Sequence, residues 1–442
     1  MIVYKFGGQT IATPERLARC LDIIEAAIPR SPIVVVSAHG NTTDLLADAA
    51  RGAQAGRIST NAIRELHVGL CEGAGVPIGL VDPLLTRLEA LLHGISLLKE
   101  LTPRTMDHVL SFGERLSSRV VAGALSQRGH EARPLAAYDL GLVTDSNFGS
   151  AAPLPGVEKA IAEKLALERG IPVVTGFIGK DAGGEITTLG RSGSDFSATI
   201  IASAAGAEEV VIWKNVDGVM TADPSLEPSA LNIPHLSFEE ASELAYFGAE
   251  VLHPSTLVPA IRKQIPVRVA NAFKEGDPGT TILAHPVPTK KIAKSVAYKE
   301  DVAMFHLIST RLLSVPEILT EALAALGRLG IVAHMITTSE AGISLIAQSG
   351  LSDSKIREAT DALGKIAPVN VYPRMAIVCM VGDELKGRAD SIGRVFSALA
   401  EAKVNPKAIA RSASEINLGF LIADGEISAA VRALHGLIAD GG

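Results

Sequence analysis

The sequence contains few cysteines and few aromatic residues. Of its 442 residues, three are cysteines (Cys20, Cys71 and Cys379), and phenylalanine, tryptophan and tyrosine together make up 4%. The number of cysteines is odd, they lie far apart, and their spacing matches no metal site. A disulfide framework is therefore not indicated, and we interpret the three residues as reduced, mostly buried thiols of a cytosolic protein.

The sequence also lacks basic clusters, long apolar runs and targeting segments. The formal net charge is -7 at pH 7, which argues against a surface for nucleic acid or for an anionic membrane. No apolar run is long enough to span a bilayer. The first residues, "MIVYKFGG", enter a strand directly and carry no basic segment of a signal peptide. We predict a cytoplasmic protein with neither nucleic acid nor membrane among its partners.

What the sequence does contain is an alternation of short strands and helices. Apolar residues make up 47% and charged residues 20%, as in globular proteins, and 442 residues predict two or three domains. Runs rich in valine and isoleucine predict buried parallel strands, with amphipathic helices between them. This pattern predicts an open, mostly parallel α/β sheet with helices on both faces over residues 1–285. The mostly helical segment 45–101 is predicted to be an insertion near the edge of the sheet.

A second kind of organisation begins after residues 274–291, "KEGDPGTTILAHPVPTKK", where proline, glycine and lysine are concentrated. The stretches "ITTSEAGISLIA" from Ile336 and "SASEINLGFLIAD" from Ser412 form an internal repeat. Around each copy the pattern predicts strand, helix, strand, strand, helix, strand, which is a ferredoxin-like α+β unit. We predict two such units, over residues 292–368 and 369–442.

The first predicted strand ends in a lysine and two glycines, in "KFGGQT" at residues 5–10. Two glycines let the backbone approach a ligand closely, with N–H groups free to point at phosphate oxygens, and Lys5 adds a mobile positive charge. The sequence has neither the GxxxxGK[ST] nor the GxGxxG pattern of other phosphate-binding loops. Lys5, Gly7 and Gly8 are therefore candidate phosphate-binding residues, and a simple tight turn is the alternative.

Three more polar segments are candidates for the rest of a site. Ser37 and Thr43 follow a buried strand, where open α/β sheets bind ligands, although Thr43 could instead cap a helix. Glu114 in "SFGERLSS" is either a ligand-binding carboxylate or a member of a surface ion pair. Arg191 in "TTLGRSGSD" can bind a carboxylate through two parallel hydrogen bonds. Asp195 in the same stretch can cap a helix, bind Mg²⁺ or hold a lysine.

Taken in order, these segments resemble the aspartate kinases of the amino-acid kinase family, and the resemblance runs essentially from end to end. The repeats "ITTSE" and "SASEIN" resemble the paired ACT domains of that family. The other matching stretches are "KFGG", "VVVSA…TTDLL", "LLKELTPRT…SFGERLS", "TGFIG", "TTLGRSGSD", "VDGVMTADP", "ELAYFGAEVLHP" and "PGTTI".

The resemblance implies an ATP-dependent phosphotransferase that acts on the side-chain carboxylate of L-aspartate. The product is 4-phospho-L-aspartate, the first intermediate of lysine, threonine and methionine synthesis. A carboxylate nucleophile is already ionised at neutral pH, so catalysis needs positioning and charge neutralisation and no general base. Mg²⁺ would accompany ATP, and no residue is assigned as a direct metal ligand.

The resemblance also assigns roles to individual residues. Lys5 would stabilise the transferring phosphoryl group, and Asp195 would orient Lys5 or help to place the metal. Arg191 would bind the α-carboxylate of aspartate and Glu114 its amino group. The remaining substrate residues would be Ser37, Thr43 and Phe177. The ATP-binding residues would be Lys5, Gly7, Gly8, Lys214, Asn215 and Met220.

Four residues near the expected nucleotide depart from the family pattern. Gln9 replaces threonine, Asn215 a common aspartate, Ser225 a common arginine and Glu250 a common lysine. Two positive charges are therefore missing, as in the plant-like branch of the family. We interpret the departures as branch variation that alters nucleotide affinity while activity is kept.

The repeats imply feedback by an amino-acid effector, lysine or threonine. His334 stands where lysine-inhibited members carry an acid that would pair with an ammonium group. We therefore hypothesise that feedback by lysine is weak or altered. Because ACT units usually associate, we expect a homodimer or a larger homo-oligomer. The regulatory residues would be His334, Thr338, Ser339, Glu340, Ser414, Glu415 and Asn417.

Two alternatives to an active aspartate kinase stay open. One is a kinase of the same fold that acts on another amino-acid-like carboxylate in a specialised pathway, which Gln9 and His39 motivate. The other is a catalytically weak protein that senses amino acids through its ACT pair. A pure sensor would let its chemical positions drift, and the retention of four of them argues against it: Lys5, Glu114, Arg191 and Asp195.

Overall fold

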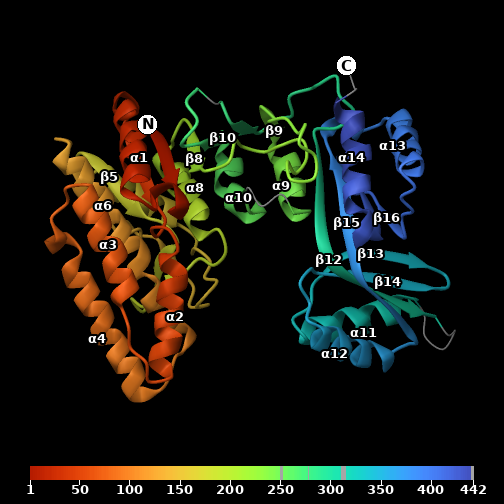
Figure 1. The fold of residues 1–442 in the computed structure, drawn as a ribbon, viewed down its shortest axis with the longest axis horizontal. Helices are drawn as coiled ribbons and strands as arrows, with labels where there is room; N and C mark the ends of the chain where they lie inside the picture. The colour runs from red at the N-terminus through yellow and green to blue at the C-terminus, as the bar shows by residue number, and fades with distance from the viewer. Residues whose placement is uncertain (249–251, 277, 310–314, 440–442) are drawn as a thin grey trace. The chain divides into compact units, whose positions relative to one another are not determined.

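The computed structural model describes residues 1–248, 252–276, 278–309 and 315–439, which form two compact units (Figure 1). The first unit comprises Met1–Val219, Pro234–Phe238 and Val251–His285. The second comprises Met220–Ile233, Glu239–Glu250 and Pro286–Gly442. Residues 220–233 are tied into the second unit by bonds such as that from Ser295 Oγ to the carbonyl of Met220, at 2.8 Å. The domain limits proposed from the sequence stay predictions.

An eight-stranded sheet forms the centre of the first unit. Neighbouring strands are parallel except for one antiparallel pair, β10 and β11, which confirms the predicted mostly parallel α/β sheet. All five residues of β1 and of β2 are buried, as expected for strands covered on both faces. In spatial order the strands are β3 (Ala132–Leu135), β5 (Ile171–Thr175), β2 (Pro32–Val36), β1 (Ile2–Phe6), β8 (Val210–Lys214), β10 (Val267–Asn271), β11 (Thr280–Leu283) and β9 (His235–Ser237).

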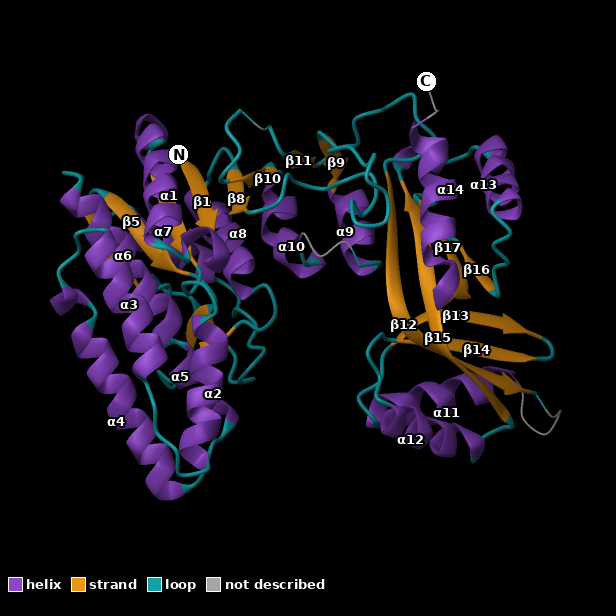
Figure 2. Cartoon of the chain, in the orientation of Figure 1, coloured by secondary structure: helices purple, strands orange, loops and turns teal. Residues whose placement is uncertain are grey.

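Helices cover both faces of this sheet (Figure 2). Side chains alternate along a strand, so Ile2, Tyr4 and Phe6 of β1 join the core on one face while Lys5 points to the other. The helices that contribute to the core of Phe6 are α1 (Pro14–Ala26), α2 (Thr42–Gln54), α3 (Asn61–Gly73), α4 (Asp82–Leu98) and α6 (Phe112–Gln127). On the face of Lys5, helix α8 (Gly193–Ala205) packs against β1. Helices α7 (Val157–Leu165) and α10 (Pro254–Lys263) pack in turn against α8. The predicted helical segment 45–101 corresponds to α2, α3 and α4.

A small three-stranded sheet carries the loop that leads to α8. Its strands are β4 (Val143–Thr144), β6 (Ile178–Asp181) and β7 (Ile186–Thr188), in that order. The short helix α5 (Pro103–Leu110) packs against β7. This sheet fixes the start of the Gly/Ser-rich loop at Leu189–Ser192.

The second unit contains the predicted repeat as one six-stranded sheet. In spatial order its strands are β13 (Ala333–Ser339), β14 (Gly342–Ala347), β12 (Ser295–Ile308), β15 (Val369–Val381), β17 (Asn417–Ala423) and β16 (Ala408–Ala410), all antiparallel to their neighbours. One hydrophobic core surrounds Phe305 and includes residues of α11 (Val315–Arg328) and α12 (Asp353–Gly364). A second core surrounds Phe420 and includes residues of α13 (Ala389–Glu401) and α14 (Ile427–Ala439). A further helix of the chain is α9 (Phe238–Tyr246).

The second copy of the repeat differs from the prediction in one detail. In chain order it consists of β15, α13, β16, β17 and α14, so among the described residues it has three strands of its own and lacks the predicted final strand. The first part of β12, Ser295–Lys299, supplies this fourth strand by pairing with Ile377–Val381 of β15. The register shifts between Lys299 and Met304, beyond which β12 continues into the first copy. The two long strands β12 and β15 therefore belong to both copies (Figure 2).

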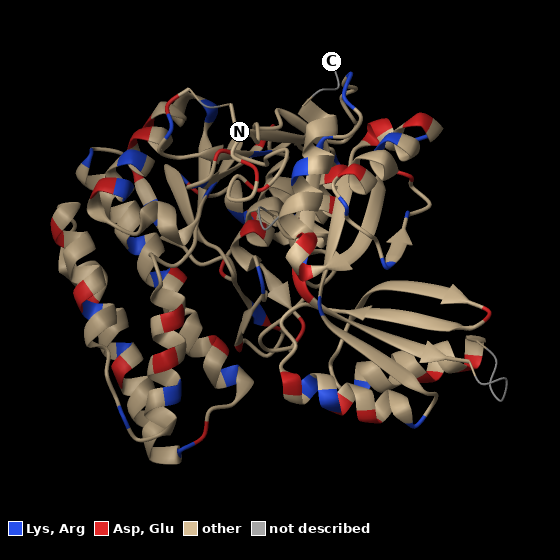
Figure 3. Cartoon of the chain, turned by 45° about the vertical axis from the view of Figure 1, so that its right-hand side comes forward, with Lys and Arg blue, Asp and Glu red and all other residues tan. Residues whose placement is uncertain are grey.

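The distribution of charged residues and the environment of the cysteines can be followed in the structure. Acidic and basic residues are interspersed along the described chain of both units (Figure 3). Cys20, Cys71 and Cys379 are all buried and free. Among the described residues, no helix is both long and apolar enough to cross a membrane.

Candidate active site

Three charged side chains meet at the carboxyl ends of β1 and β8. Lys5 Nζ lies 2.6 Å from Oδ1 of Asp195, in the first turn of α8, and Lys214 Nζ lies 3.8 Å from Oδ2. Lys5 and Asp195 are only 6% and 4% exposed. Burial alone would raise the pKa of Asp195, but the two ammonium groups outweigh it and hold this pKa below its usual range. The cluster carries one more positive than negative charge, which suits an anionic ligand.

The two glycines after β1 play different parts. A Cβ on Gly8 would lie 2.4 Å from the carbonyl oxygen of Ala38, so a glycine is needed there for the turn to pack. The N–H of Gly7 donates to the carbonyl of Trp213 at 3.3 Å, and its role toward a phosphate stays a prediction. A Cβ on Gly7 would stand 3.7 Å from Lys5 Nζ. Glycine at this position therefore keeps the space beside the ammonium open.

Glu114 is a second buried carboxylate, in the first turn of α6. Its Oε1 accepts a hydrogen bond from the N–H of Ala38 at 3.1 Å. Its Oε2 is buried and has no hydrogen-bond partner in the described part of the chain. Burial raises the pKa of Glu114 to about 8, although the Ala38 amide and the charge of Lys5 act in the opposite direction. A surface ion pair is thus excluded, and the unused oxygen suits a cationic group of a ligand.

The loop that follows β2 carries two further predicted residues. Ser37 and Thr43 are both partly exposed, and the N–H of Ser37 donates to the carbonyl of Phe6 at 3.1 Å. Thr43 is the second residue of α2, a helix without a side-chain cap, so the capping alternative is wrong. His39 is fully buried, its Nδ1 lies 2.7 Å from the carbonyl of Ile11, and burial lowers its pKa to about 3. His39 is therefore a neutral structural residue.

Phe177 adopts a backbone conformation that is rare for a residue with a side chain. Its φ is 64°, in the left-handed region. The N–H of Phe177 donates to Ser197 Oγ on α8 at 3.0 Å, and its carbonyl accepts from the N–H of Leu189 at 2.9 Å. These two bonds hold the strained residue between α8 and the end of β7, where the resemblance places substrate.

Arg191 lies in the exposed loop before α8. The start of that loop is positioned by Asp107, a residue that the sequence analysis did not identify. Asp107 on α5 is buried and accepts from the N–H of Thr188 at 2.8 Å, from the Thr188 hydroxyl at 2.9 Å and from the N–H of Gly149 at 2.9 Å. It thereby fixes the strand end three residues before Arg191. The only signal in the sequence was that Asp107 lies between the quoted stretches "LLKELTPRT" and "SFGERLS".

The predicted nucleotide residues are divided between the two units. Asn215 is exposed directly after β8, beside a turn in which Asp217 binds Asn271 at 2.6 Å and Lys274 at 2.8 Å. Met220 and Ser225 belong to the second unit, so the roles assigned to them stay predictions. Glu250 lies outside the described residues.

The predicted regulatory residues of the first copy lie along β13. Thr338, Ser339 and Glu340 are exposed at the end of this strand. The His334 ring meets the edge of Tyr246, with ring centroids 5.3 Å apart, and the carbonyl of His334 accepts from the Tyr246 hydroxyl at 3.0 Å. Burial and the nearby charge of Lys299 lower the pKa of His334 to about 4. This side chain is neutral at physiological pH.

The corresponding residues of the second copy already have partners within the second unit. Ser414 shares a hydrogen bond with Ser412 at 2.6 Å. Glu415 accepts from the N–H of Gly387 at 2.8 Å and from Arg411 at 3.3 Å. Asn417 Nδ2 donates to the carboxylate of Glu243 at 2.5 Å. In the first copy, Ser339 also has a partner, since its hydroxyl donates to the carbonyl of Gly342 at 3.3 Å.

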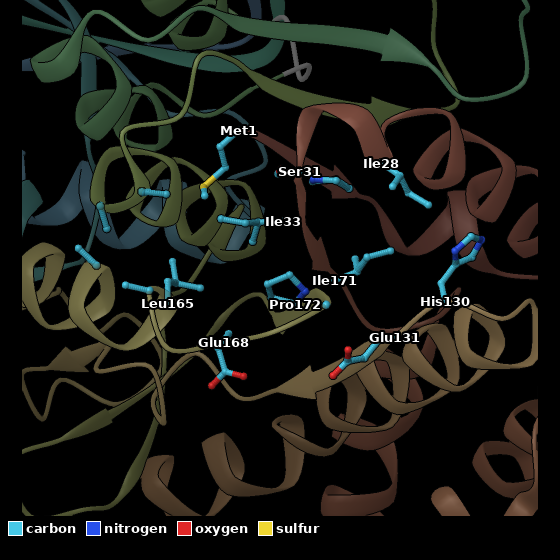
Figure 4. A pocket seen from close by; sticks show the side chains of 16 residues that line it. Met1, Ile28, Ser31, Ile33, His130, Glu131, Leu165, Glu168, Ile171 and Pro172 are labelled. Atoms are coloured by element: carbon cyan, nitrogen blue, oxygen red, sulfur yellow. The ribbon is translucent and has the colours of Figure 1, made fainter.

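A cavity of about 610 Å³ lies at the opposite edge of the first-unit sheet, at the amino ends of β1, β2 and β5 (Figure 4). Its lining is mainly apolar and includes Ile28, Ile33, Leu165, Ile171 and Pro172, with His130, Glu131 and Glu168 also contributing. Because Lys5 and Ser37 lie at the carboxyl ends of their strands, this cavity is not part of the candidate active site.

Comparison with known proteins agrees with this geometry. A model of the amino acid kinase family matches residues 1–271, and a model of the ACT domain matches residues 378–437. The chain is 37% identical over 451 residues to aspartokinase 1, chloroplastic, of Arabidopsis thaliana, covering 98% of this chain and 79% of that protein. The chain belongs to the amino acid kinase family, among the aspartokinases.

Solved structures of aspartokinases have the same fold over their whole length. E. coli aspartokinase III in complex with aspartate and ADP, in its R-state, matches with a TM-score of 0.82 and 29% identity, covering 100% of both chains. The complex of that E. coli protein with lysine and aspartate, in its T-state, matches with a TM-score of 0.81 and 30% identity, covering 99% of both chains. The kinase sheet and the ACT sheet of the present aspartokinase thus both have solved counterparts.

Proposed function

We propose that this aspartokinase transfers the γ-phosphoryl group of ATP to the side-chain carboxylate of L-aspartate, giving 4-phospho-L-aspartate and ADP. The observation that carries the proposal is Glu114, a buried carboxylate with one unused oxygen beside a lysine cluster suited to phosphate. The complex of E. coli aspartokinase III with aspartate and ADP supports the same pair of ligands. We further propose that the reaction takes place in the cytoplasm and opens lysine, threonine and methionine synthesis.

Recognition of aspartate would divide between its two charged groups. The substrate ammonium would occupy the position facing Glu114 Oε2, satisfying the buried oxygen and favouring the ionised carboxylate. The guanidinium of Arg191 would bind the α-carboxylate through two parallel hydrogen bonds. Ser37, Thr43 and Phe177 would line the rest of the pocket. An acid and a guanidinium at opposite ends select an α-amino acid over a simple dicarboxylic acid.

Phosphoryl transfer would depend on the lysine cluster. The side-chain carboxylate of aspartate attacks the γ-phosphorus, the bond to the β,γ-bridging oxygen breaks, and ADP leaves. Lys5 would neutralise charge that develops on the transferring group, and the open space above Gly7 gives that group access to the ammonium. Asp195 would keep the ammonium groups of Lys5 and Lys214 in place. Because the attacking carboxylate is already ionised, the neutral, buried His39 is not needed as a base.

Mg²⁺ would enter this reaction as part of the substrate Mg·ATP. In the described ranges, no group of three or more His, Cys, Asp or Glu side chains is placed to hold a metal ion. Asp195 is engaged by two lysines and is therefore poorly suited to be a sole metal ligand. We propose that the ATP phosphates hold the ion and that Lys214, Asn215 and Met220 are the nucleotide-binding residues.

The proposal is tested by measuring ADP release with Mg·ATP and a panel of L-aspartate, L-glutamate, D-aspartate and N-acetyl-L-aspartate. Trapping with hydroxylamine detects the acyl phosphate as a hydroxamate. A hydroxamate formed with L-aspartate and not with N-acetyl-L-aspartate is expected, because acetylation removes the ammonium that Glu114 binds. Turnover of a different acid would change the assigned substrate and leave the proposed mechanism unchanged. No turnover of any acid by folded protein would favour the ACT sensor.

For regulation, we propose that lysine is a weak effector. E. coli aspartokinase III was solved with lysine, and lysine carries an ammonium on its side chain. In this chain the neutral His334 offers that ammonium no negative charge, and Lys299 lies close enough to lower the pKa of His334. We expect His334→Asp to increase lysine sensitivity by about tenfold, through one charge-assisted contact. Inhibition of the unsubstituted enzyme by micromolar lysine would contradict the proposal.

We also propose that the chain forms a homodimer or a larger homo-oligomer through its second unit. β13 is an edge strand of the six-stranded sheet, and Val332 and Ile336 beside and on it are 57% and 40% exposed. Exposed edge strands with apolar side chains favour pairing with another chain. Light scattering coupled to size-exclusion chromatography should give at least twice the mass of one chain, and Ile336→Lys should lower it.

A further inference from the structure

A polar cavity of about 460 Å³ lies in the first unit among α4, α5, α6, the turn after β3 and the β6–β7 hairpin. Its lining contains none of the candidate active-site residues, so it is a separate feature. Four cationic side chains line it: Arg87 on α4, Arg115 and Arg119 on α6, and Lys180 on β6. Two carboxylates, Asp139 and Glu185, also line it. The lining therefore carries a net positive charge in a protein whose overall charge is -7.

The four cations lack the carboxylate partners that such side chains usually have. Among the described residues, none of them lies within ion-pair distance of an acid, and Glu185 instead pairs with Arg104 at 3.6 Å. Nη1 of Arg115 is buried and has no hydrogen-bond partner in the described part of the chain. Nη1 of Arg119 donates to the backbone carbonyl of Arg115 at 2.9 Å. Buried donors in native proteins are normally satisfied, so the unused Arg115 group points to a missing acceptor.

Aromatic rings hold two of these cations in place without neutralising them. The guanidinium of Arg115 lies 4.8 Å from the ring centroid of Phe112, and Lys180 Nζ lies 4.0 Å from that of Tyr138. Burial lowers the pKa of Arg115, and repulsion from Arg119 and Arg87 adds to this, while Tyr138 and Asp139 act in the opposite direction. The like charges therefore repel one another within the folded chain, and an anion between them would relieve that repulsion.

The chemistry of the lining narrows the class of ligand. Three guanidinium groups and one ammonium group match a doubly charged phosphate better than a single carboxylate, because each guanidinium presents a fork of donors. Asp139 and Glu185 would repel a second anionic group but can accept hydrogen bonds from hydroxyl or amino groups. A volume of about 460 Å³ falls in the range of small-molecule sites. We propose that this cavity binds a small phosphate monoester that carries hydroxyl or amino groups at its other end.

The proposal is tested by isothermal titration calorimetry on the full-length chain. Lys5→Met is used as the background, so that phosphate binding beside Lys5 in the candidate active site is weakened. The probes are inorganic phosphate, glycerol 3-phosphate and glycerol. We expect one saturable site per chain for glycerol 3-phosphate, weaker binding of inorganic phosphate, and no binding of glycerol.

Three variants in the same background locate the site. Arg87→Gln should weaken binding of glycerol 3-phosphate by about tenfold, because one charged contact is lost. Arg87 is exposed, so this variant is expected to fold even where the double variant Arg115→Gln/Arg119→Gln does not. Arg57→Gln removes an equal charge from an exposed residue elsewhere in the unit and should leave binding unchanged.

Three results would overturn the proposal. The first is the absence of saturable binding of glycerol 3-phosphate by folded protein. The second is equal affinity of the background protein and its Arg87→Gln variant. The third is inorganic phosphate binding as tightly as glycerol 3-phosphate, which would show that the site does not recognise the monoester.

Discussion

Asp195 and Glu114 are both almost fully buried carboxylates of the first unit, yet their pKa values are shifted in opposite directions. Asp195 lies between two lysines, and its pKa is below the usual range. Glu114 accepts one backbone hydrogen bond, and its pKa is about 8. Burial of the two residues is nearly equal, at 4% and 3% exposure. The partners of a buried acid, more than its depth, therefore set its charge.

The difference separates a completed contact from an incomplete one. Asp195 finds its counter-charges within the chain and so serves to hold Lys5 and Lys214. In the part of the chain that the structure describes, the second oxygen of Glu114 has no hydrogen-bond partner, so a ligand could complete it. The second unit contains another buried carboxylate with an internal counter-charge, since Glu240 pairs with Lys294 at 3.0 Å. Four predictions test the comparison.

Removing the lysine at the completed contact should have the largest effect on catalysis. Lys5→Met deletes the charge proposed to stabilise the phosphoryl group and leaves Asp195 with Lys214 only. We expect kcat to fall by about 10³-fold, the magnitude typical of a lost electrostatic contact in a transition state. Steady-state kinetics measure it, with Arg57→Gln as a charge-matched control. A loss below about tenfold would show that Lys5 is not central.

Neutralising the incomplete contact should act mainly on substrate affinity. Glu114→Gln keeps the shape of the side chain and removes the charge that the substrate ammonium would meet. We expect the KM for aspartate to rise by roughly 10- to 100-fold, the value of a charge-assisted hydrogen bond. The KM for ATP should change little. An unchanged KM for aspartate would show that Glu114 does not bind the substrate.

The pH dependence should follow from the raised pKa of Glu114. Below about pH 8 the free enzyme holds a proton on this residue, and the aspartate ammonium binds best after the proton has left. At pH 7, binding of aspartate should therefore release about one proton, and kcat/KM should rise about tenfold per pH unit up to pH 8. Calorimetry in buffers of different ionisation enthalpy counts the proton. Glu114→Gln should abolish the release, and if it does not, another group titrates.

Stability should show the smallest effect, with opposite signs for the two carboxylates. The raised pKa of Glu114 contributes stability that is complete below its unfolded pKa and is lost as the pH rises through about 8. Glu114→Gln should therefore raise Tm relative to the unsubstituted protein at pH 9, by roughly 2 °C, and leave it nearly unchanged near pH 4.

Asp195 behaves in the reverse sense. Its lowered pKa contributes stability above its unfolded pKa, and this contribution is lost only as the pH falls through the folded value. Asp195→Asn should therefore lower Tm at both pH 5 and pH 9, because two buried lysines lose their counter-charge. Differential scanning fluorimetry measures all four values. If both variants shifted Tm in the same direction at pH 9, the comparison would be wrong.

Much of the fold could be predicted because it depends on local patterns. The run "PIVVV" within "SPIVVVSA" is apolar at every position, which is typical of a parallel strand covered on both faces, and β2 is such a strand. The repeat of "ITTSE" and "SASEIN" predicted two related α+β units. The shared strands β12 and β15 could not be predicted, because a strand's partners depend on residues far away in the sequence.

For the candidate site, the sequence by itself determined which chemical groups are available: a lysine and two glycines after β1, carboxylates at 114 and 195, and an arginine in a glycine-rich loop. Only the tertiary structure decided their states. It joined Asp195 to Lys5 and Lys214, isolated one oxygen of Glu114, bonded the Gly7 amide to Trp213, and placed Asp107 under the loop of Arg191. The physical reason is that composition and periodicity act over a few residues, whereas charge and hydrogen bonding depend on distances between residues far apart in the chain.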